Sequence, residues 1–317
     1  MNNFFDGADK KIQYEEIIVC LFDGEYNLGA AALINSLVKF DFKGLIHIGY
    51  RGALPDWVNQ LKYLGEGYYY VTDDITIHFK KVDTEMHLGY YKPYFLKETF
   101  NDYKSTNKIY YFDADIVIKV PWSFYSNWLQ NGVCLCLDNS FYFLHHSHPW
   151  RKEWKKLAPK NGISFNDINY YFNSGFLGVE RESLSLIDKW IYFTEKHIEV
   201  GRNINGFDKD HYHSLKGDQD LLNAAITISP DIEISIIGTE GMGFTFQASI
   251  MSHAIGDSKP WNNLFFKQLI KSGRKPSSAD KSFFSNCEYP VSIFSPFDFQ
   301  MKKMDLFMAS FFGRVLG

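Results

Sequence analysis

The amino-acid sequence predicts an α/β protein with a doubly wound, mostly parallel central sheet and a C-terminal helical extension. Over the first ~115 residues, short apolar runs alternate with helical patterns, which is the β-α-β order that builds a parallel sheet. Two of the apolar runs end in acids, one at Asp23 and one at Asp113 and Asp115. Ligands of such sheets bind at the carboxyl ends of the strands, so we expect these three acids to face one crevice.

The individual elements follow from local patterns of apolar residues. Before the paired acids we expect strands at residues 16–22, 44–50, 68–72 and 109–112, and helices at 28–40, 55–64 and 91–103. After them we expect strands at 132–137, 174–179 and 232–237, and helices at 183–200 and 217–227. From Pro260 onward no alternation is clear, so we divide the chain into one domain at residues 1–265 and an extension at 266–317.

Composition excludes several classes of function. The net charge of −4, without a long run of one sign, argues against a general nucleic-acid binder. Residues 1–16 are polar and acidic, and no stretch approaches the ~20 apolar residues of a spanning helix, so we expect a cytoplasmic protein. The cysteines form no CxxC pair, and we interpret all four as small reduced core residues: Cys20, Cys134, Cys136 and Cys287.

The paired acids predict a metal site. Asp113 and Asp115 stand at i and i+2 after the apolar run 109–112, so their side chains point the same way in extended backbone. Two like charges gain from a cation between them, and His253 is our candidate for a third ligand from a distant loop. Oxygen ligands suit Mg²⁺ or Mn²⁺, and an imidazole favours Mn²⁺. Lys259, six residues after His253, is placed to meet the phosphates that such a metal carries.

Each of these residues also has a simpler interpretation. An acid-x-acid pair is often a solvated turn, and a single histidine is more often structural than a ligand. Asp218 could be a helix N-cap, and Asp220 could be an acid that favours the positive end of the helix dipole. Capping, however, accounts for only one of these two acids. The cluster at His145, His146 and His148 lacks a cysteine or acid at ligand spacing, so we do not expect zinc there.

Five segments in order resemble a GT-A fold glycosyltransferase of family 8, the family of bacterial lipopolysaccharide galactosyl- and glucosyltransferases and of glycogenin. The resemblance covers roughly residues 17–261, and its most specific part is His253-x-x-Gly256-x-x-Lys259-Pro260-Trp261. The other segments are Phe22-Asp23-Gly24-Glu25-Tyr26, Tyr111-Phe112-Asp113-Ala114-Asp115, Phe172-Asn173-Ser174-Gly175 and Asp218-Gln219-Asp220-Leu221-Leu222-Asn223.

The resemblance implies a role for each matched residue. Asp113, Asp115 and His253 would bind Mn²⁺, and Lys259 and the backbone of Gly256 would contact the donor diphosphate. Asp23 and Tyr26 would hold the nucleobase, and the basic Lys92 would lie near the donor. Asn173, Asp218 and Gln219 would line the donor sugar, and Asp218 and Gln219 are the catalytic candidates. The family retains the anomeric configuration, which implies attack from the same face without an enzyme nucleophile.

Three stretches depart from the family pattern. Lys119 and Val120 follow the paired acids where many relatives carry another acid, and Gly24-Glu25 replaces the usual acid-Asn after Asp23, which affects the base contacts. Residues 131–168 match nothing in the family pattern and lie where acceptor recognition is expected to vary.

The tail carries an apolar helical face flanked by Lys302, Lys303 and Arg314. Such a face either lies on a membrane interface, where lipid-linked acceptors are found, or packs on the domain. The residues of the face are Met304, Phe307, Met308, Phe311, Phe312 and Val315.

We therefore predict a metal-dependent transfer of a hexose from UDP-galactose or UDP-glucose to a glycan acceptor of a bacterial surface. A sugar nucleotidyltransferase is the second hypothesis, although the Gly-rich basic loop of those enzymes is not found at residues 23–28. A catalytically silent protein that binds nucleotide sugars or glycans is the third.

Overall fold

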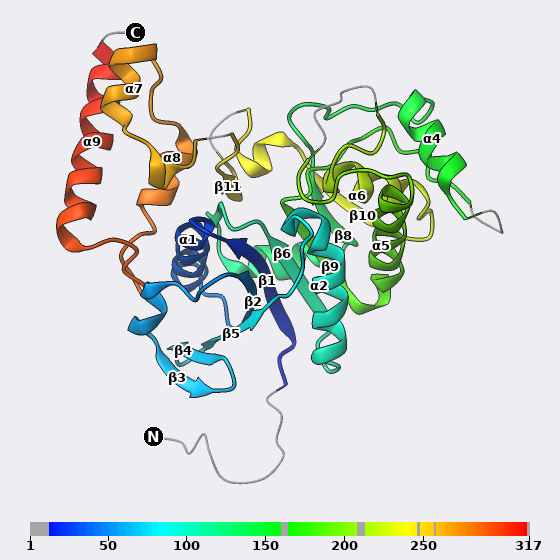
Figure 1. Cartoon of the computed structure of the whole chain (residues 1–317), viewed down its shortest axis with the longest axis horizontal. Helices are drawn as coiled ribbons and strands as arrows, with labels where there is room; N and C mark the ends of the chain where they lie inside the picture. The colour runs from blue at the N-terminus through cyan, green and yellow to red at the C-terminus, as the bar shows by residue number, and fades with distance from the viewer. Residues whose placement is uncertain (1–12, 160–163, 208–212, 246–247, 257, 316–317) are drawn as a thin grey trace.

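The computed structural model describes residues 13–159, 164–207, 213–245, 248–256 and 258–315 (Figure 1). Its strands are β1 (Glu16–Asp23), β2 (Gly44–Arg51), β3 (Lys62–Gly65), β4 (Tyr68–Thr72), β5 (Ile75–Lys81), β6 (Lys108–Phe112), β7 (Ile116–Ile118), β8 (Val133–Cys136), β9 (Phe176–Glu180), β10 (Ile234–Ile237) and β11 (Met251–His253). Its α-helices are α1 (Tyr26–Lys39), α2 (Leu88–Asp102), α3 (Trp122–Leu129), α4 (Pro149–Leu157), α5 (Leu184–Glu199), α6 (Asp218–Thr227), α7 (Phe265–Ser272), α8 (Ser278–Phe284) and α9 (Pro296–Val315).

One large sheet organises these elements, in the order β10-β8-β9-β6-β1-β2-β5-β4-β3. Its centre, β6-β1-β2-β5, is parallel. β9 runs antiparallel between β6 and β8, and β4 and β3 add an antiparallel edge. The mixed α/β fold with a mainly parallel centre confirms the predicted fold class.

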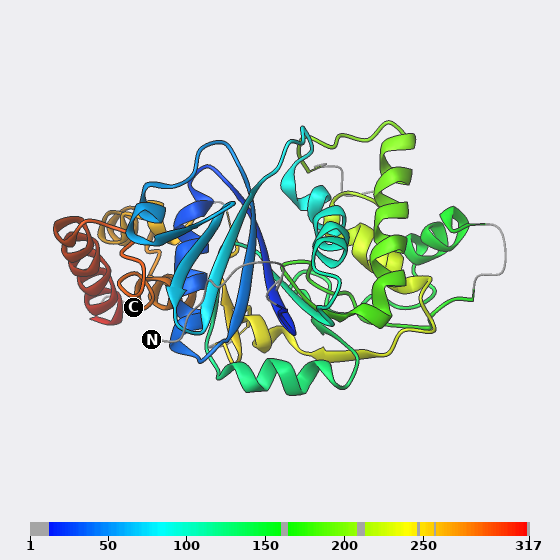
Figure 2. The ribbon, with the colours of Figure 1, turned by 90° about the horizontal axis from the view of Figure 1, so that it is seen from below.

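The central strands are apolar on both faces because helices cover both sides. In β1, Ile18, Cys20 and Phe22 belong to the core shared with α1 and the C-terminal helices. The alternate residues Ile17, Val19 and Leu21 belong to the core shared with α2, α5 and α6. Figure 2 shows the two layers of helices on opposite sides of the sheet. The four cysteines are buried and free, as predicted.

A second sheet of two strands lies at the carboxyl edge of the first. β11 pairs with β7 in antiparallel register, so that His253 stands opposite Ile116 and Met251 opposite Ile118. Ala254 N also donates to Asp115 O over 3.0 Å. This pairing brings a segment from residue 250 onward beside the paired acids, about 140 residues earlier in the chain.

The C-terminal segment is helical and is tied to the sheet domain. Ala309 and Gly313 of α9 are buried, and the Asp305 carboxylate accepts from the backbone N–H groups of Phe265 and Phe266, at the start of α7. Lys302 Nζ donates to Trp261 O over 2.9 Å. None of the helices within the described residues is long and apolar enough to cross a membrane. The domain boundary at residue 265 stays a prediction.

Several expectations for single elements were wrong. The helix expected at 55–64 is a short 3₁₀ turn at Asp56–Gln60 followed by β3, because the tyrosines and threonines that come next favour a meander. The strand at 68–72 is antiparallel rather than part of a β-α-β unit, since β5 follows it directly. β5, with its alternately buried Ile75, Ile77 and Phe79, was missed, as were α3, α4, β7 and β11.

His47, on β2, predicts how stability depends on pH. Its side chain is fully buried, and burial followed by the neighbouring His78 lowers its pKa well below the usual value. Below about pH 6.5, the imidazole of His47 binds a proton in the unfolded chain but stays neutral in the folded chain. We therefore expect the free energy of unfolding to decrease by roughly 1 kcal/mol per pH unit between pH 6.5 and 5.

Urea denaturation of wild type and His47→Gln at several pH values measures this slope. The variant should lose most of it, whereas His145→Gln, at an exposed histidine, should keep it. An unchanged slope in His47→Gln would show that another group controls the acid sensitivity.

Candidate functional site

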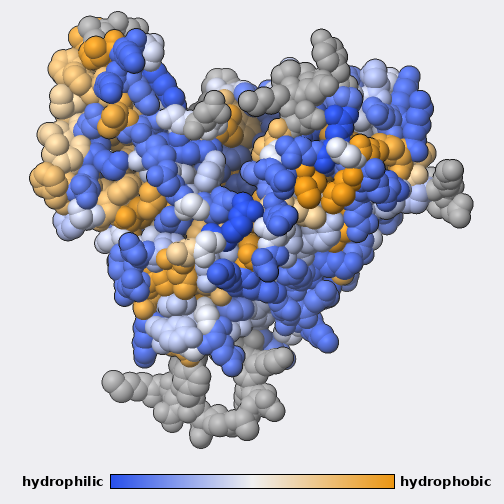
Figure 3. Space-filling model, viewed as in Figure 1, coloured by the Kyte–Doolittle hydropathy of each residue, from blue (hydrophilic) through white to orange (hydrophobic). Residues whose placement is uncertain are grey.

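A pocket of about 330 Å³ opens at the carboxyl edge of the central strands. Figure 3 shows the surface hollowed there, between the C-terminal helices and the side that carries α4. Its walls come from the end of β1, the start of α2, the turn after β6, the turn before β9, the start of α6 and the loop after β11. This volume lies within the range of small-molecule sites.

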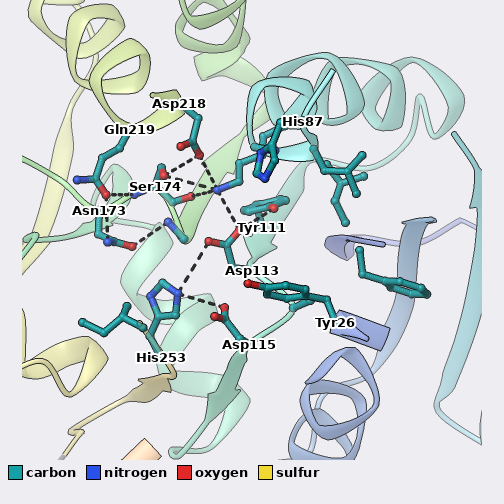
Figure 4. Close-up of a pocket in the computed structure, with 18 of the residues that line it drawn as sticks. Tyr26, His87, Tyr111, Asp113, Asp115, Asn173, Ser174, Asp218, Gln219 and His253 are labelled. Carbon is teal, nitrogen blue, oxygen red and sulfur yellow. Dashed lines mark hydrogen bonds and ion pairs between the residues drawn. The ribbon is translucent and has the colours of Figure 1, made fainter. Parts of the chain in front are cut away.

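Three potential metal ligands meet in this pocket (Figure 4). Ligand atoms of Asp113, Asp115 and His253 all lie within 4.8 Å of one another. His253 Nε2 is 3.1 Å from Asp115 Oδ1 and 3.9 Å from Asp113 Oδ2. The β7–β11 pairing positions His253, and the turn after β6 positions the two acids.

The backbone beside the three ligands is closely packed against them. A Cβ at Gly175 would lie 2.7 Å from His253 Cε1 and 2.9 Å from Asp113 Oδ2, closer than real Cβ contacts come, so only glycine fits there. His253 Nδ1 is buried and finds no hydrogen-bond partner among the described residues. Two carboxylates and an imidazole form a donor set suited to a divalent cation, so these residues fit a metal.

Asp115 faces two cationic or potentially cationic side chains. Lys259 Nζ donates to Asp115 Oδ2 over 2.7 Å and to Ala254 O over 2.8 Å. Burial alone would raise the pKa of Asp115, but His253 and Lys259 hold it well below its usual range. Asp115 is therefore ionised in the folded protein at neutral pH, as a metal ligand must be.

A buried lysine lies between the start of α6 and the three potential metal ligands Asp113, Asp115 and His253, which we name the metal trio. Lys92 Nζ, on α2, lies 2.9 Å from Asp113 Oδ1 and 2.7 Å from Asp218 Oδ2, and it donates to Ser174 O over 3.2 Å. Burial alone would lower the pKa of Lys92, but the two acids raise it above its usual range. Burial would likewise raise the pKa of Asp218, yet Lys92 lowers it. The two groups thus form a charged pair.

Amide groups complete the wall beside Asp218. Asn173 Nδ2 donates to Gln219 Oε1 over 3.1 Å and to Asp138 Oδ2 over 2.9 Å. The Ser174 backbone N–H also donates to Gln219 Oε1, and its hydroxyl donates to Asp218 Oδ2 over 2.9 Å. Figure 4 shows Asn173, Ser174, Asp218 and Gln219 gathered on the side of the pocket opposite Tyr26.

The two acids at the start of α6 have different surroundings. The Asp220 carboxylate accepts from the backbone N–H groups of Lys216 and Gly217, and from Tyr171 Oη over 2.6 Å. Asp220 therefore caps the helix, and burial raises its pKa to about 6. Asp218, interpreted from the sequence as a possible N-cap, instead lines the pocket.

The end of β1 lines the opposite side of the pocket. Asp23 pairs with Arg51 Nη2, and Arg51 also donates to Thr84 O and Met86 O. The ring of Tyr26 lies 5.4 Å beneath Lys259 Nζ and packs edge-on against Trp261. Gly256 also lines the pocket, with a backbone φ of 104° that favours glycine.

The structure thus brings every predicted site residue to one pocket. Sequence reasoning missed several others that line or support it: Arg51, His87, Tyr111, Ser174 and Phe207. Arg51 was detectable, because it ends the strand next to β1 and parallel strands meet at one edge. Tyr111 Oη donates to Asp113 Oδ1 over 2.8 Å, but nothing in its apolar run distinguishes it from a core residue.

Comparison with known proteins relates most of the chain to one family. Residues 17–264 match the family described as Glycosyl transferase family 8. A search of curated protein sequences found no match. Among solved structures, the apo form of the bifunctional glycosyltransferase WbbM has a TM-score of 0.53 at 17% identity, covering 96% of this chain and 52% of that one. The chain therefore spans about half the length of WbbM.

Two structures of LgtC match over nearly their full length. An active-site mutant has a TM-score of 0.52 at 15% identity, covering 90% of this chain and 99% of that one. The galactosyltransferase LgtC in complex with donor and acceptor sugar analogues has a TM-score of 0.51 at 16% identity, with the same coverage. At these identities the likeness concerns the fold.

Removal of the Lys92 charge should destabilise the protein. Lys92→Met leaves the buried Asp218 and the half-buried Asp113 without their cation, so we expect a loss of about 3 kcal/mol in the free energy of unfolding, measured in EDTA. Lys97→Met is the matched control on the same helix, because Lys97 forms an exposed pair with Asp188 and should cost less than about 1 kcal/mol. Equal effects of the two variants would contradict a charged, buried pair.

Proposed function

Because the chain belongs to glycosyltransferase family 8, we propose that it transfers a hexose from UDP-galactose or UDP-glucose to a glycan acceptor, with retention of configuration. Synthesis of a bacterial surface polysaccharide or lipopolysaccharide is the proposed setting. The observation that carries the proposal is Lys92 lying between Asp113 of the metal trio and Asp218. That contact supports a metal–diphosphate end directly beside a polar sugar end.

The proposed cofactor is Mn²⁺, with Mg²⁺ as the alternative, held by Asp113, Asp115 and His253. A divalent cation held there would stabilise the negative charge that develops on the diphosphate as the sugar leaves. The close ligand atoms and the space kept by Gly175 support this assignment.

The residues of the chain supply further stabilisation at the diphosphate end. Lys259 Nζ lies between Asp115 and the Tyr26 ring, and its ammonium is proposed to meet a phosphate oxygen beside the metal. The backbone of Gly256 lines the same wall. Asp23, held by Arg51, and the partly exposed ring of Tyr26 are proposed to hold the uracil base, the ring by stacking.

At the sugar end, Asp218, Gln219 and Asn173 are proposed to contact the donor hexose. A leaving diphosphate creates positive charge on the sugar, which the carboxylate of Asp218 and the amide oxygen of Gln219 stabilise. Asp220 caps α6 and accepts from Tyr171, and Asp218 is paired with Lys92, so neither carboxylate is free to attack the sugar. This supports attack by the acceptor from the face that the diphosphate leaves.

The C-terminal end supports contact with a membrane surface. Phe307, Phe311 and Val315 of α9 are exposed by 69%, 54% and 69%, whereas Met308 is half-buried and Phe312 contacts Phe266. Apolar colour covers this end of the molecule in Figure 3. Residues 264–317 carry eight basic and four acidic side chains, although the whole chain has a net charge of −4.

We propose that this face lies on an anionic lipid surface that presents the acceptor. Aromatic and aliphatic side chains bind the boundary of the acyl chains, and flanking lysines and arginines bind anionic headgroups. The cytoplasmic location expected from the sequence stays a prediction.

The proposed reaction predicts Mn²⁺-dependent release of UDP from one UDP-hexose by the purified protein. Asp115→Asn should reduce this release at least about 100-fold, because a metal ligand is lost. Asp73→Asn, at an exposed turn far from the pocket, should leave the rate unchanged. Silence of the wild type with every UDP-hexose, with and without glycan acceptors, would favour a binding protein that does not catalyse transfer.

The proposed membrane face predicts sedimentation with vesicles of phosphatidylglycerol and phosphatidylcholine. Phe307→Ser combined with Phe311→Ser should weaken the partition at least about tenfold, since two exposed rings no longer enter the lipid. Tyr63→Ser, which removes an exposed ring on β3, should bind as the wild type does. Equal sedimentation of all three proteins would contradict the membrane contact.

A further inference from the structure

A run of exposed aromatic side chains follows β8 at the carboxyl edge of the sheet. Phe141, Tyr142 and Phe143 are exposed by 41%, 60% and 57%. Adjacent exposed rings of this size are unusual on a protein surface without a binding partner. They lie within residues 131–168, where acceptor recognition is expected to vary.

The loop that carries these rings is held firmly by a buried arginine. Arg151, on α4, is fully buried, and its guanidinium donates to Leu144 O, Tyr170 O and the Thr227 hydroxyl. Leu144 N also donates to Asn169 O over 2.9 Å, and Phe143 forms a β-bridge with Tyr170. The aromatic run is therefore presented on a braced segment, which lowers the entropy cost of binding a ligand.

The innermost ring of the run belongs to a cationic aromatic cluster. Phe141 packs edge-on against Trp150, with ring centroids 5.5 Å apart. Lys216 Nζ lies 4.3 Å from the centroid of the Trp150 ring and 5.4 Å from that of Phe141. We name Phe141, Trp150 and Lys216 the aromatic cluster.

This cluster adjoins the proposed sugar end of the pocket. Lys216 precedes Asp218 by two residues, and its backbone N–H donates to Asp220. Phe141 also packs against Tyr171, whose hydroxyl donates to Asp220. The Asp138 carboxylate, three residues before Phe141, accepts a hydrogen bond from the Asn173 side chain. The cluster and the pocket thus share their supporting residues.

We propose that the aromatic cluster is an outer acceptor subsite, which binds a sugar ring of the acceptor beyond the one that receives the hexose. This inference rests on the glycosyltransferase function proposed above and deepens it: the acceptor is an oligosaccharide rather than a monosaccharide.

The chemistry of the cluster suits a pyranose. Sugar rings present an apolar face of C–H groups that packs on an aromatic ring, while hydroxyl groups around the rim need hydrogen-bond donors and acceptors. Phe141 and Trp150 supply the rings, and the ammonium of Lys216 supplies three donors. A monosaccharide that occupies the reaction centre leaves this surface uncovered.

A binding measurement without donor or metal tests the subsite directly. Saturation-transfer NMR is recorded with a panel of mono- and tetrasaccharides of galactose, glucose, N-acetylglucosamine and glucuronic acid. We expect at least one tetrasaccharide to bind tenfold or more tightly than its monosaccharide. Phe141→Ala and Lys216→Gln should each weaken that tetrasaccharide roughly three- to tenfold, the effect of one ring or one polar contact.

Tyr63→Ser is the matched control, because it removes a comparably exposed ring at the far edge of the sheet and should leave binding unchanged. Lys216→Gln replaces a partly exposed side chain, so a folding defect in Phe141→Ala does not remove the test. Equal binding of mono- and tetrasaccharides, no binding of any panel member, or tetrasaccharide binding unaffected by Lys216→Gln would overturn the subsite.

Kinetics separate this inference from the proposed function. If UDP release occurs as proposed, Lys216→Gln should raise the KM for the tetrasaccharide acceptor and leave UDP release without acceptor unchanged. If the wild type releases no UDP, the proposed transferase activity itself is contradicted. If UDP release is normal but Lys216→Gln leaves the KM unchanged, only the subsite is contradicted.

Discussion

Lys92 Nζ lies 2.9 Å from Asp113 and 2.7 Å from Asp218 with its side chain almost fully buried, and the rest of the site depends on this contact. Two carboxylates from distant segments approach one another only because a cation separates them. In the proposed function, Asp113 would share its charge with a metal and Asp218 would face the donor sugar. It also explains why a helix with Pro93 in its interior carries a lysine into the core.

The second constraint is the pairing of β7 with β11, which brings His253 to the paired acids. Gly175 sits against both ligand types, and a side chain there would meet His253 and Asp113. The trio is therefore defined by backbone as much as by side chains: a strand pairing sets the histidine, a turn sets the acids, and a glycine preserves the space between them. Sites built this way position ligands before an ion arrives.

Around this centre, the fold presents two different surfaces. On the C-terminal side, α9 packs through Phe299, Ala309 and Gly313 and leaves Phe307 and Phe311 exposed. On the side of α4, Arg151 braces a loop whose aromatic rings adjoin the start of α6. Under the proposals above, a lipid-presented glycan would meet both surfaces, with the pocket between them.

The sequence alone determined the central strands, because apolar runs of five or more residues have no place except between two layers of helices. It also determined the pairing of Asp113 with Asp115, a consequence of period-two backbone, and, through the family pattern, the arrival of His253 and Lys259. Only the tertiary structure decided which acid of α6 is a cap and which faces the pocket, and that Asp23 is held by Arg51. It also decided that residues 62–81 form a meander instead of a helix and a parallel strand. The physical reason is that charge compensation and strand order depend on partners far apart in the chain, whereas burial and side-chain direction are properties of the local run.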